Sequence, residues 1–257
     1  MNTSDSALMR QEFKFNGDIF TKVYDKRTDT YQFFHNDEPI DIYQWNQAVN
    51  RYQPMSHKST HPNVIIRLIE RQRWRLTRRH IHADQSSAVV DIGCESGNIS
   101  ASLVSSCRRV VLMDVDEGVL RTIHNRWKGR SVTCLAGDVY KIPFASGSID
   151  RIICTEVLEH LVRPQEALSE IERVLKRGGK ALISIPNDHL ILWVKRKLIR
   201  AGLSKALGNL SPGLPMGHLH VFSKESLASL LGPRLKLRKC FYNFPWFTNL
   251  FFVVEKR

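Results

Sequence analysis

The sequence is poor in cysteine, in long apolar runs and in acidic residues. Its five cysteines are an odd number with no CxxC pair, which argues against a disulfide scaffold and against a zinc ribbon. Residues 1–11 show no secretory leader, so we expect a cytoplasmic protein. The longest apolar stretches, at 190–194 and 251–254, fall far short of the roughly 20 residues that a membrane-spanning helix needs. We therefore expect no transmembrane anchor.

The shortage of acid leaves a strongly basic chain. Lys and Arg number 38 against 25 Asp and Glu, which gives a formal net charge of +13. Such an excess is compatible with binding to nucleic acid, to an anionic membrane surface or to an acidic substrate, and also with no specific partner. The positive charge concentrates in residues 67–79, 195–205 and 234–239.

The first sixty residues differ from the rest in their pattern of apolar and turn residues. Short apolar runs alternate with turn residues, including an Asn16-Gly17 pair, and this pattern predicts a small β meander. We expect a β-rich extension at 1–60, to which the sequence assigns no role, and a main domain at 61–257. Pro62 suits the first turn of a helix whose apolar face would be formed by Val64, Ile65, Leu68, Ile69 and Leu76, with arginines on its other side.

From Ala88 onward, short apolar runs alternate with amphipathic stretches, as in βαβ units of a parallel sheet with helices on both faces. Two closely spaced runs at the end of the chain should pair as an antiparallel hairpin. The expected strands are 89–92, 110–113, 132–135, 149–154, 181–185, 235–242 and 250–255, and the expected helices between them are 99–107, 118–127 and 165–176.

Three acids follow successive strands of this pattern. Asp91 opens a loop in which Gly93 and Gly97 allow a tight turn, and the N–H groups at the next helix start favour a carboxylate ligand. Asp114 ends the second strand, where a carboxylate can accept both ribose hydroxyls of a nucleoside, and Asp138 follows the third strand. All three acids should lie at the carboxyl ends of parallel strands, where open sheets bind ligands.

These motifs resemble the class I S-adenosylmethionine-dependent methyltransferases, and in particular the methyltransferase type 11 and ubiquinone-pathway O-methyltransferases. The resemblance covers residues 87–257 and includes Asp91-x-Gly93-x-x-x-Gly97, Asp114, Gly137-Asp138 and a Gly178-Gly179 pair before the fifth strand. It implies a Rossmann-like, mostly parallel seven-stranded sheet with an antiparallel last strand. It also implies S-adenosylmethionine as cofactor, with its methionine part at the 91–97 loop, its ribose at Asp114, its adenine at Asp138 and Val139, and Thr155 completing the cofactor-binding set.

The chain departs from the family at one glycine. Glu95 stands where the middle glycine of Gly-x-Gly-x-Gly is usual. An NAD site needs that glycine so that the pyrophosphate can come close, and Glu95 would repel it. S-adenosylmethionine has no phosphate, so we interpret Glu95 as a tolerated variant.

The residues expected on the acceptor side of the site allow three interpretations. Glu156, Glu159 and His160 follow the fourth strand and would share one face if a helix begins there, and His218 lies downstream, before a helix at 224–231. In one reading, His160 or His218 is a general base on an acceptor hydroxyl. In another, these carboxylates and imidazoles bind a divalent cation, as the resemblance to ubiquinone-pathway and small-RNA 2′-O-methyltransferases implies. In the third they form a structural turn. His220 is expected to be a packing neighbour.

A basic and apolar segment at 190–205 lies in an expected insertion at 188–217. Five basic residues and no acid accompany Leu, Ile and Trp there. This composition suits either a helix at a membrane interface or a lid over the acceptor pocket with its basic face in water, and the lid is favoured.

The leading functional prediction is methyl transfer to oxygen of a small-molecule or lipid-like acceptor, in the cytoplasm or peripherally on a membrane. The alternatives are an RNA methyltransferase, suggested by the charge, and a non-catalytic scaffold that keeps the fold, suggested by Glu95.

Overall fold

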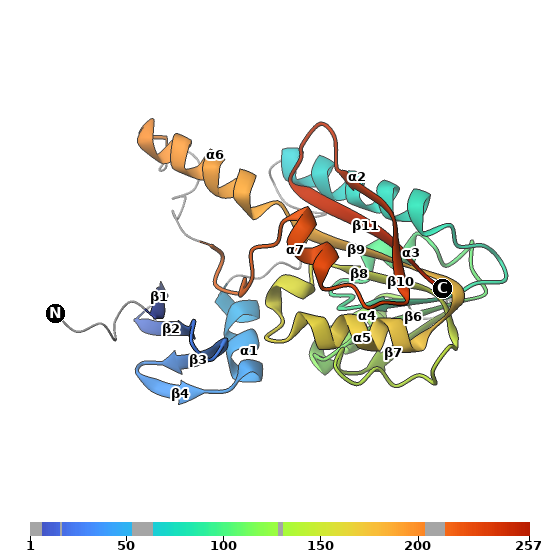
Figure 1. Ribbon diagram of the computed structural model, residues 1–257, viewed down its shortest axis with the longest axis horizontal. Helices are drawn as coiled ribbons and strands as arrows, with labels where there is room; N and C mark the ends of the chain where they lie inside the picture. The colour runs from blue at the N-terminus through green and yellow to red at the C-terminus, as the bar shows by residue number, and fades with distance from the viewer. Residues whose placement is uncertain (1–6, 16, 53–63, 128–130, 204–213) are drawn as a thin grey trace. The chain divides into compact units, whose positions relative to one another are not determined.

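The computed structural model describes residues 7–15, 17–52, 64–127, 131–203 and 214–257. The chain divides into two compact units, each visible in Figure 1. The first unit comprises residues 1–55 together with 215–219, and the second comprises 56–214 together with 220–257.

The first unit contains a four-stranded antiparallel sheet in chain order and one helix. Gly17, with φ of 97°, supplies the left-handed conformation of the first hairpin turn, whose other residue lies outside the described ranges. Trp45 of the helix is fully buried and packs on the rings of Phe13, Phe20 and Phe33. The expected β-rich extension is confirmed, and the helix was not predicted. The elements are β1 (Leu8–Phe15), β2 (Asp18–Asp25), β3 (Thr30–His35), β4 (Glu38–Ile40) and α1 (Ile42–Tyr52).

A short segment from late in the chain completes this first unit. The buried Lys22 ammonium donates to the carbonyl oxygens of Met216 and His218, and the Tyr31 hydroxyl donates to the carbonyl of Leu219. Residues 215–219 are therefore held by side chains of β2 and β3.

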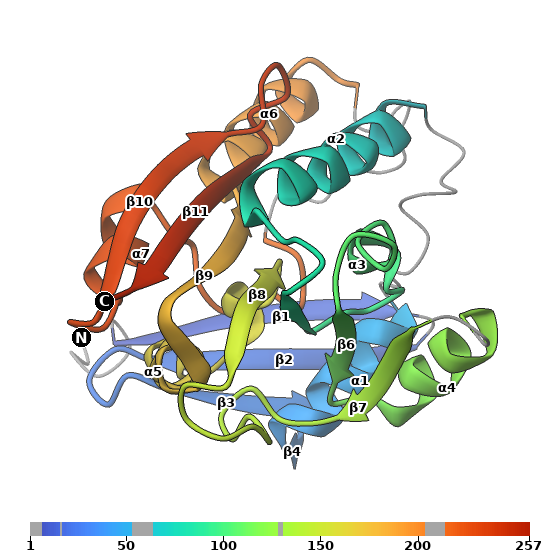
Figure 2. The same ribbon diagram turned by 90° about the vertical axis from the view of Figure 1, so that its right-hand side faces the viewer.

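The second unit is built on a sheet that contains seven of the described strands (Figure 2). Its order is β10-β11-β9-β8-β5-β6-β7; the pairs from β9 to β7 are parallel, whereas β11 pairs antiparallel with both β9 and β10. The predicted Rossmann-like sheet with an antiparallel last strand is confirmed. The strands are β5 (Ala88–Ile92), β6 (Arg109–Asp114), β7 (Val132–Ala136), β8 (Ile149–Thr155), β9 (Leu175–Pro186), β10 (Leu235–Tyr242) and β11 (Asn249–Lys256).

Helices cover both faces of this sheet. Alternate strand residues point to opposite faces, so Val90 packs in one apolar cluster with Leu168, while Val89 packs in the other with Ile123. The first cluster includes α5 and α7, and the second includes α4 and the end of α2. The helices are α2 (Val64–Ile81), α3 (Asn98–Ala101), α4 (Glu117–Arg126), the 3₁₀ turn η1 (Leu158–His160), α5 (Pro164–Val174), α6 (Asp188–Arg200) and α7 (Lys224–Ser229).

Two element bounds differ clearly from the sequence predictions. The helix expected over 99–107 is only the four-residue α3, and it continues as turns. Strand β9 begins at Leu175, six residues before the expected start, because Leu175 already pairs with Ile149 of β8.

The predicted apolar face of α2 is wrong in the first two turns and right at Leu76, which packs, partly buried, against an apolar cluster. Val64, Ile65 and Leu68 are 54%, 47% and 44% exposed, whereas Glu70 and Arg73 are buried. The two buried charges form an ion pair, with Arg73 Nη1 lying 2.7 Å from Glu70 Oε2. A polar face can be buried when its charges satisfy one another. Pro62, expected in the first turn, lies outside the described residues.

Helix α6 projects from the second unit in Figure 1. The Asn187 side chain caps it by accepting a hydrogen bond from the Leu190 N–H at 3.3 Å. Apart from Asp188, its residues are at least partly exposed. None of the helices in the described part of the chain is both long and apolar enough to cross a membrane.

Candidate functional site

The loop between β5 and α3 is built around two glycines in the left-handed conformation. Gly93 and Gly97 have φ of 65° and 66°. A Cβ at Gly93 would lie 2.5 Å from Val157 Cγ2, and one at Gly97 would lie 2.9 Å from Leu112 Cδ1. The Gly93 N–H donates to the carbonyl of Met113 at 2.9 Å, which fixes the loop against β6. Both the conformation and the space thus require glycine at these two positions.

Glu95 lies between them and is also left-handed, with φ of 47°. This conformation costs an ordinary residue about 1–2 kcal/mol and is one that glycine adopts freely. The Glu95 N–H donates to Asp114 Oδ2 at 3.1 Å, so its backbone helps to orient that carboxylate.

The two carboxylates at the ends of β5 and β6 are buried in different ways. Asp91 is 3% exposed and accepts a hydrogen bond from Ser100 Oγ at 2.6 Å, and burial raises its pKa to about 7. Asp114 accepts from two backbone N–H groups, those of Glu95 and Asp116, and burial raises its pKa as well. The structure brings these acids together with the glycine loop at the carboxyl edge of the parallel strands.

Asp138 and Val139 follow β7 and have different surroundings. Asp138 Oδ1 accepts from the Tyr140 N–H at 2.9 Å and shapes the turn. Val139 is 8% exposed, and its side chain belongs to the apolar cluster on the α5 side of the sheet.

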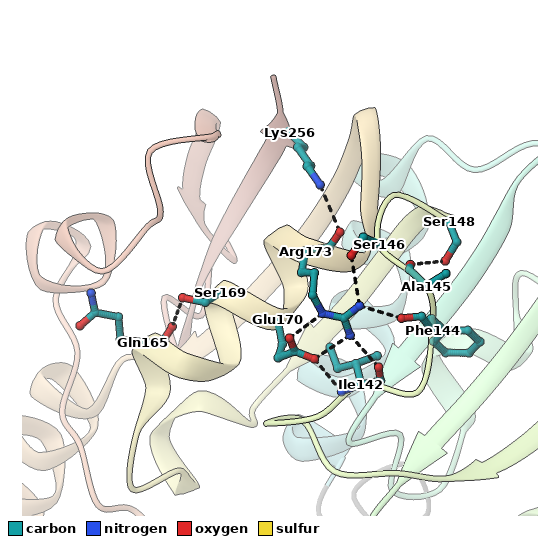
Figure 3. Close-up of polar contacts among 10 residues, drawn as sticks. All are labelled: Ile142, Phe144, Ala145, Ser146, Ser148, Gln165, Ser169, Glu170, Arg173 and Lys256. Atoms are coloured by element: carbon teal, nitrogen blue, oxygen red, sulfur yellow. Dashed lines mark hydrogen bonds and ion pairs between the residues drawn. The ribbon is translucent and has the colours of Figure 1, made fainter.

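A cavity of about 620 Å³ lies beside this turn, lined in part by Gly137, Tyr140 and Phe144. Arg173 holds its wall in place, as Figure 3 shows. The guanidinium donates to the carbonyls of Ile142 and Phe144, each at 2.8 Å, and pairs with Glu170 at 2.6 Å. An arginine in the last turn of α5 therefore fixes the loop that follows the Asp138 turn.

The acceptor-side residues after β8 do not share a helix face. The expected helix is only the three-residue η1, and Glu156 before it has φ of 58°. Glu156 Oε1 instead accepts from Ser184 Oγ at 3.2 Å and Asn249 Nδ2 at 2.9 Å, so it is held toward β9 and β11. Glu159 is 1% exposed, and its Oε1 lies 3.9 Å from His160 Nε2.

The remaining candidates lie in different units. Thr155 ends β8 and is buried in the second unit. His218 is buried in the 215–219 segment of the first unit, where its carbonyl accepts from Lys22. His220 stacks on Phe222 with a centroid separation of 5.5 Å, as expected of a packing neighbour.

Sequence reasoning missed one prominent group, the buried guanidinium of Arg73 on α2. Burial alone would lower its pKa, but Glu156, Glu70 and Glu95 offset this and raise it. Its Nε has no hydrogen-bond partner among the described residues. As one of several arginines in a basic helix, it carries no signal in the sequence that distinguishes it from its exposed neighbours.

Comparison with known proteins gives one consistent family. Residues 90–183 match the methyltransferase domain family. The demethylmenaquinone methyltransferase of Clavibacter sepedonicus is 29% identical over 139 residues, which cover 53% of this chain and 57% of that protein. The chain spans about half the length of several curated relatives that it matches.

Solved structures extend the likeness of fold. The N-methyltransferase NodS from Bradyrhizobium japonicum WM9, in complex with S-adenosyl-L-homocysteine, aligns with a TM-score of 0.57 at 18% identity, over 84% of this chain and 99% of that one. The [4+2]-cyclase SpnF aligns with a TM-score of 0.60 at 13% identity, over 84% and 93% of the two chains.

Proposed function

We propose that this chain, which belongs to the class I S-adenosylmethionine-dependent methyltransferases, transfers a methyl group to an oxygen of a small-molecule or lipid-like acceptor. The observation that carries the proposal is the left-handed Gly93 to Gly97 loop, hydrogen-bonded through Glu95 to the Asp114 carboxylate. Fold alone would not suffice, because the similar SpnF is described as a [4+2]-cyclase.

The residues present fit S-adenosylmethionine. A cradle of glycines with no room for side chains suits the close approach of a ligand to the backbone. Asp91, Gly93 and Gly97 would hold its methionine part, Asp114 its ribose, and Asp138 with Val139 its adenine. Thr155 would complete the cofactor-binding set. The cofactor supplies an electrophilic methyl group on a sulfonium.

The chain's own contribution is positioning and proton removal. Holding the acceptor oxygen in line with the methyl group converts a bimolecular step into one of fixed geometry. The attacking oxygen must lose its proton, and we assign this to the imidazole of His160 or His218 because imidazole titrates near neutral pH. A divalent cation bound by Glu156, Glu159 and these histidines is the alternative.

The acceptor class rests on two observations. The relative from Clavibacter sepedonicus is named for demethylmenaquinone, a small-molecule acceptor. Helix α6 exposes Trp193 and Val194, side chains suited to contact with an apolar molecule. We extend this to the domain organisation: 1–60 forms the extension, 61–257 the methyltransferase domain, and 188–217 its acceptor lid, although residues 215–217 group with the first unit.

Cofactor binding is tested first. Asp114→Ala should abolish binding of S-adenosylhomocysteine in titration calorimetry, whereas the exposed Glu117→Gln should keep it. Unchanged affinity of Asp114→Ala would reject the assignment of that residue. If the unaltered protein does not bind the cofactor product at all, the chain is a scaffold.

Turnover is tested next, by S-adenosylhomocysteine release with phenolic and quinol acceptors and with total RNA. His160→Ala and His218→Ala should lower turnover and leave cofactor affinity unchanged, and the exposed His124→Ala is the control. Loss of both properties would indicate a structural role. Turnover that is lost on chelation and restored by a divalent ion would show that a metal, and not a histidine base, activates the acceptor. Turnover with RNA alone would show that the acceptor is RNA and not a small molecule.

A further inference from the structure

Three elements of the second unit expose large apolar side chains. The first turns of α2 contribute Val64, Ile65 and Leu68, and α6 contributes Trp193, which is 54% exposed. The turn between β10 and β11 contributes Phe244, which is 72% exposed, and Phe247. Monomeric soluble proteins seldom gather such residues without a use for them. We call the exposed apolar residues of these three elements the apolar patch.

Hydrogen bonds connect the three elements of the apolar patch. Gln72 Nε2 of α2 donates to the carbonyl of Phe244. Asn187, the cap of α6, donates through its side chain to the carbonyl of Phe247 and through its backbone N–H to that of Thr248, each at 2.8 Å. Figures 1 and 2 both show the β10–β11 turn next to α2. The turn is therefore linked by hydrogen bonds to both helices that contribute to the apolar patch.

The exposed charges around the apolar patch are positive. On α2 the exposed stripe continues from Leu68 to Arg71 and Arg75 at helical spacing. The acids of these two helices, Glu70 and Asp188, are buried at 8% and 1% exposure. Neither Arg71 nor Arg75 forms an ion pair with a residue that the structure describes. The remaining exposed cations of α2 and α6 are Arg78, Arg79, Arg196, Lys197 and Arg200.

We propose that the apolar patch and its surrounding arginines and lysines dock this chain on an anionic phospholipid bilayer. Apolar and aromatic side chains would enter the boundary between headgroups and acyl chains, while the cations would contact anionic headgroups. The proposal rests on the proposed function, because docking would let the chain reach a lipid-like acceptor in the bilayer.

Charge and side-chain type argue against a second copy of this chain and against single-stranded nucleic acid as the partner of the apolar patch. A second copy of the chain would present the same positive charge and be repelled. Single-stranded nucleic acid would stack its bases on the aromatic rings of the patch but would leave the aliphatic Val64, Ile65 and Leu68 exposed to water. A bilayer accommodates aliphatic, aromatic and cationic side chains at the same interface.

The test is co-sedimentation of the full chain with phosphatidylcholine vesicles that contain or lack phosphatidylserine. The unaltered protein should bind the anionic vesicles, and binding should fall with salt. Trp193→Ser combined with Phe244→Ser should weaken partition by about tenfold or more. Arg71→Ala combined with Arg75→Ala should weaken it and reduce its dependence on salt. The matched controls, Val115→Ser and Arg177→Ala, change exposed residues of the same unit elsewhere and should bind normally.

Binding of S-adenosylhomocysteine, measured on the same preparations, separates this proposal from the proposed function. All four variants should keep it. A protein that binds the cofactor product but no anionic vesicle overturns the docking proposal and leaves the proposed function standing. An equal loss of vesicle binding in the control variants also overturns it. So does a protein that binds total RNA but no vesicle and whose RNA binding is unchanged by the Trp193 and Phe244 substitutions.

Discussion

Helices α2 and α5 pack on the same sheet, but the middle of α2 buries charged side chains where α5 buries apolar ones. α5 buries Leu168 and Ile171 completely, as its apolar spacing predicts. α2 buries Glu70 and Arg73 and leaves its most apolar turn exposed. The difference reflects what each helix meets: α5 covers apolar strand residues, whereas Arg73 of α2 faces the acids of the loops at the ends of the strands. A helix buries the face that its partner surface can satisfy.

The largest effect should come from removing the buried cation of α2. Arg73→Ala leaves Glu70 buried without its ion-pair partner, and we expect a loss of about 4 kcal/mol of unfolding free energy. Urea denaturation should show this, with the exposed Arg71→Ala changing stability by less than about 0.5 kcal/mol. Similar values for the two variants would mean that the α2 charges are solvated.

The next effect compares one leucine on each helix. Leu168→Ala in α5 removes a fully buried side chain and should cost about 3 kcal/mol. Leu68→Ala in α2 removes a side chain that is 44% exposed and should cost about 0.5 kcal/mol or less. The same denaturation measurement decides the matter, and a large loss at Leu68 would contradict the exposed position of that turn.

A third comparison uses pH. Burial raises the pKa of Asp91 to about 7 from its ordinary 3.8, so between these values the folded protein holds a proton that the unfolded chain has lost. The stabilisation is complete below pH 3.8 and is lost as pH rises through 7. Relative to Asp91→Asn, the unaltered protein should lose about 2–3 kcal/mol between pH 5 and pH 8. Glu166→Gln on the exposed side of α5 is the control; a constant difference for Asp91→Asn would show that Asp91 is ionised throughout.

The smallest expected effect concerns Glu95. Replacing it by glycine relieves its left-handed backbone but removes an acid that stabilises the Arg73 charge. Glu95→Gly should therefore be more favourable by about 1 kcal/mol when Arg73 is already alanine than when it is present. A double-mutant cycle measures this coupling, and additive free energies would show that the two side chains do not interact.

Local motifs were enough to locate part of the candidate site. Gly93 and Gly97 lie in one short loop whose sequence demands a tight turn, and Asp114 ends an apolar run that can only be an interior strand. Such features depend on neighbours in sequence, so spacing reveals them. The parallel sheet followed for the same reason, from apolar runs and helical stretches in alternation.

The features that could not be predicted from the sequence depend on contacts between residues far apart along the chain. Helical spacing in α2 fits burial of its apolar stripe and equally well burial of the stripe with Glu70 and Arg73. Burial of Arg73 is stabilised by the charges of Glu95 and Glu156, which lie outside α2. Glu156 was expected on a helix, but Asn249, 93 residues away, holds it elsewhere. The backbone carbonyl of His218 binds Lys22, 196 residues earlier, a contact that no local pattern in the sequence indicates.

The packing of residues 215–219 on β2 and β3 makes the first unit discontinuous in sequence. The chain passes between the two units after residues 55, 214 and 219, so no single cut separates them. A protein nicked between residues 55 and 56 would keep its two fragments associated through the contacts of Lys22 and Tyr31 with that segment. A fragment that begins at residue 56 would instead leave three backbone carbonyls of the segment, those of Met216, His218 and Leu219, without the donors that now satisfy them.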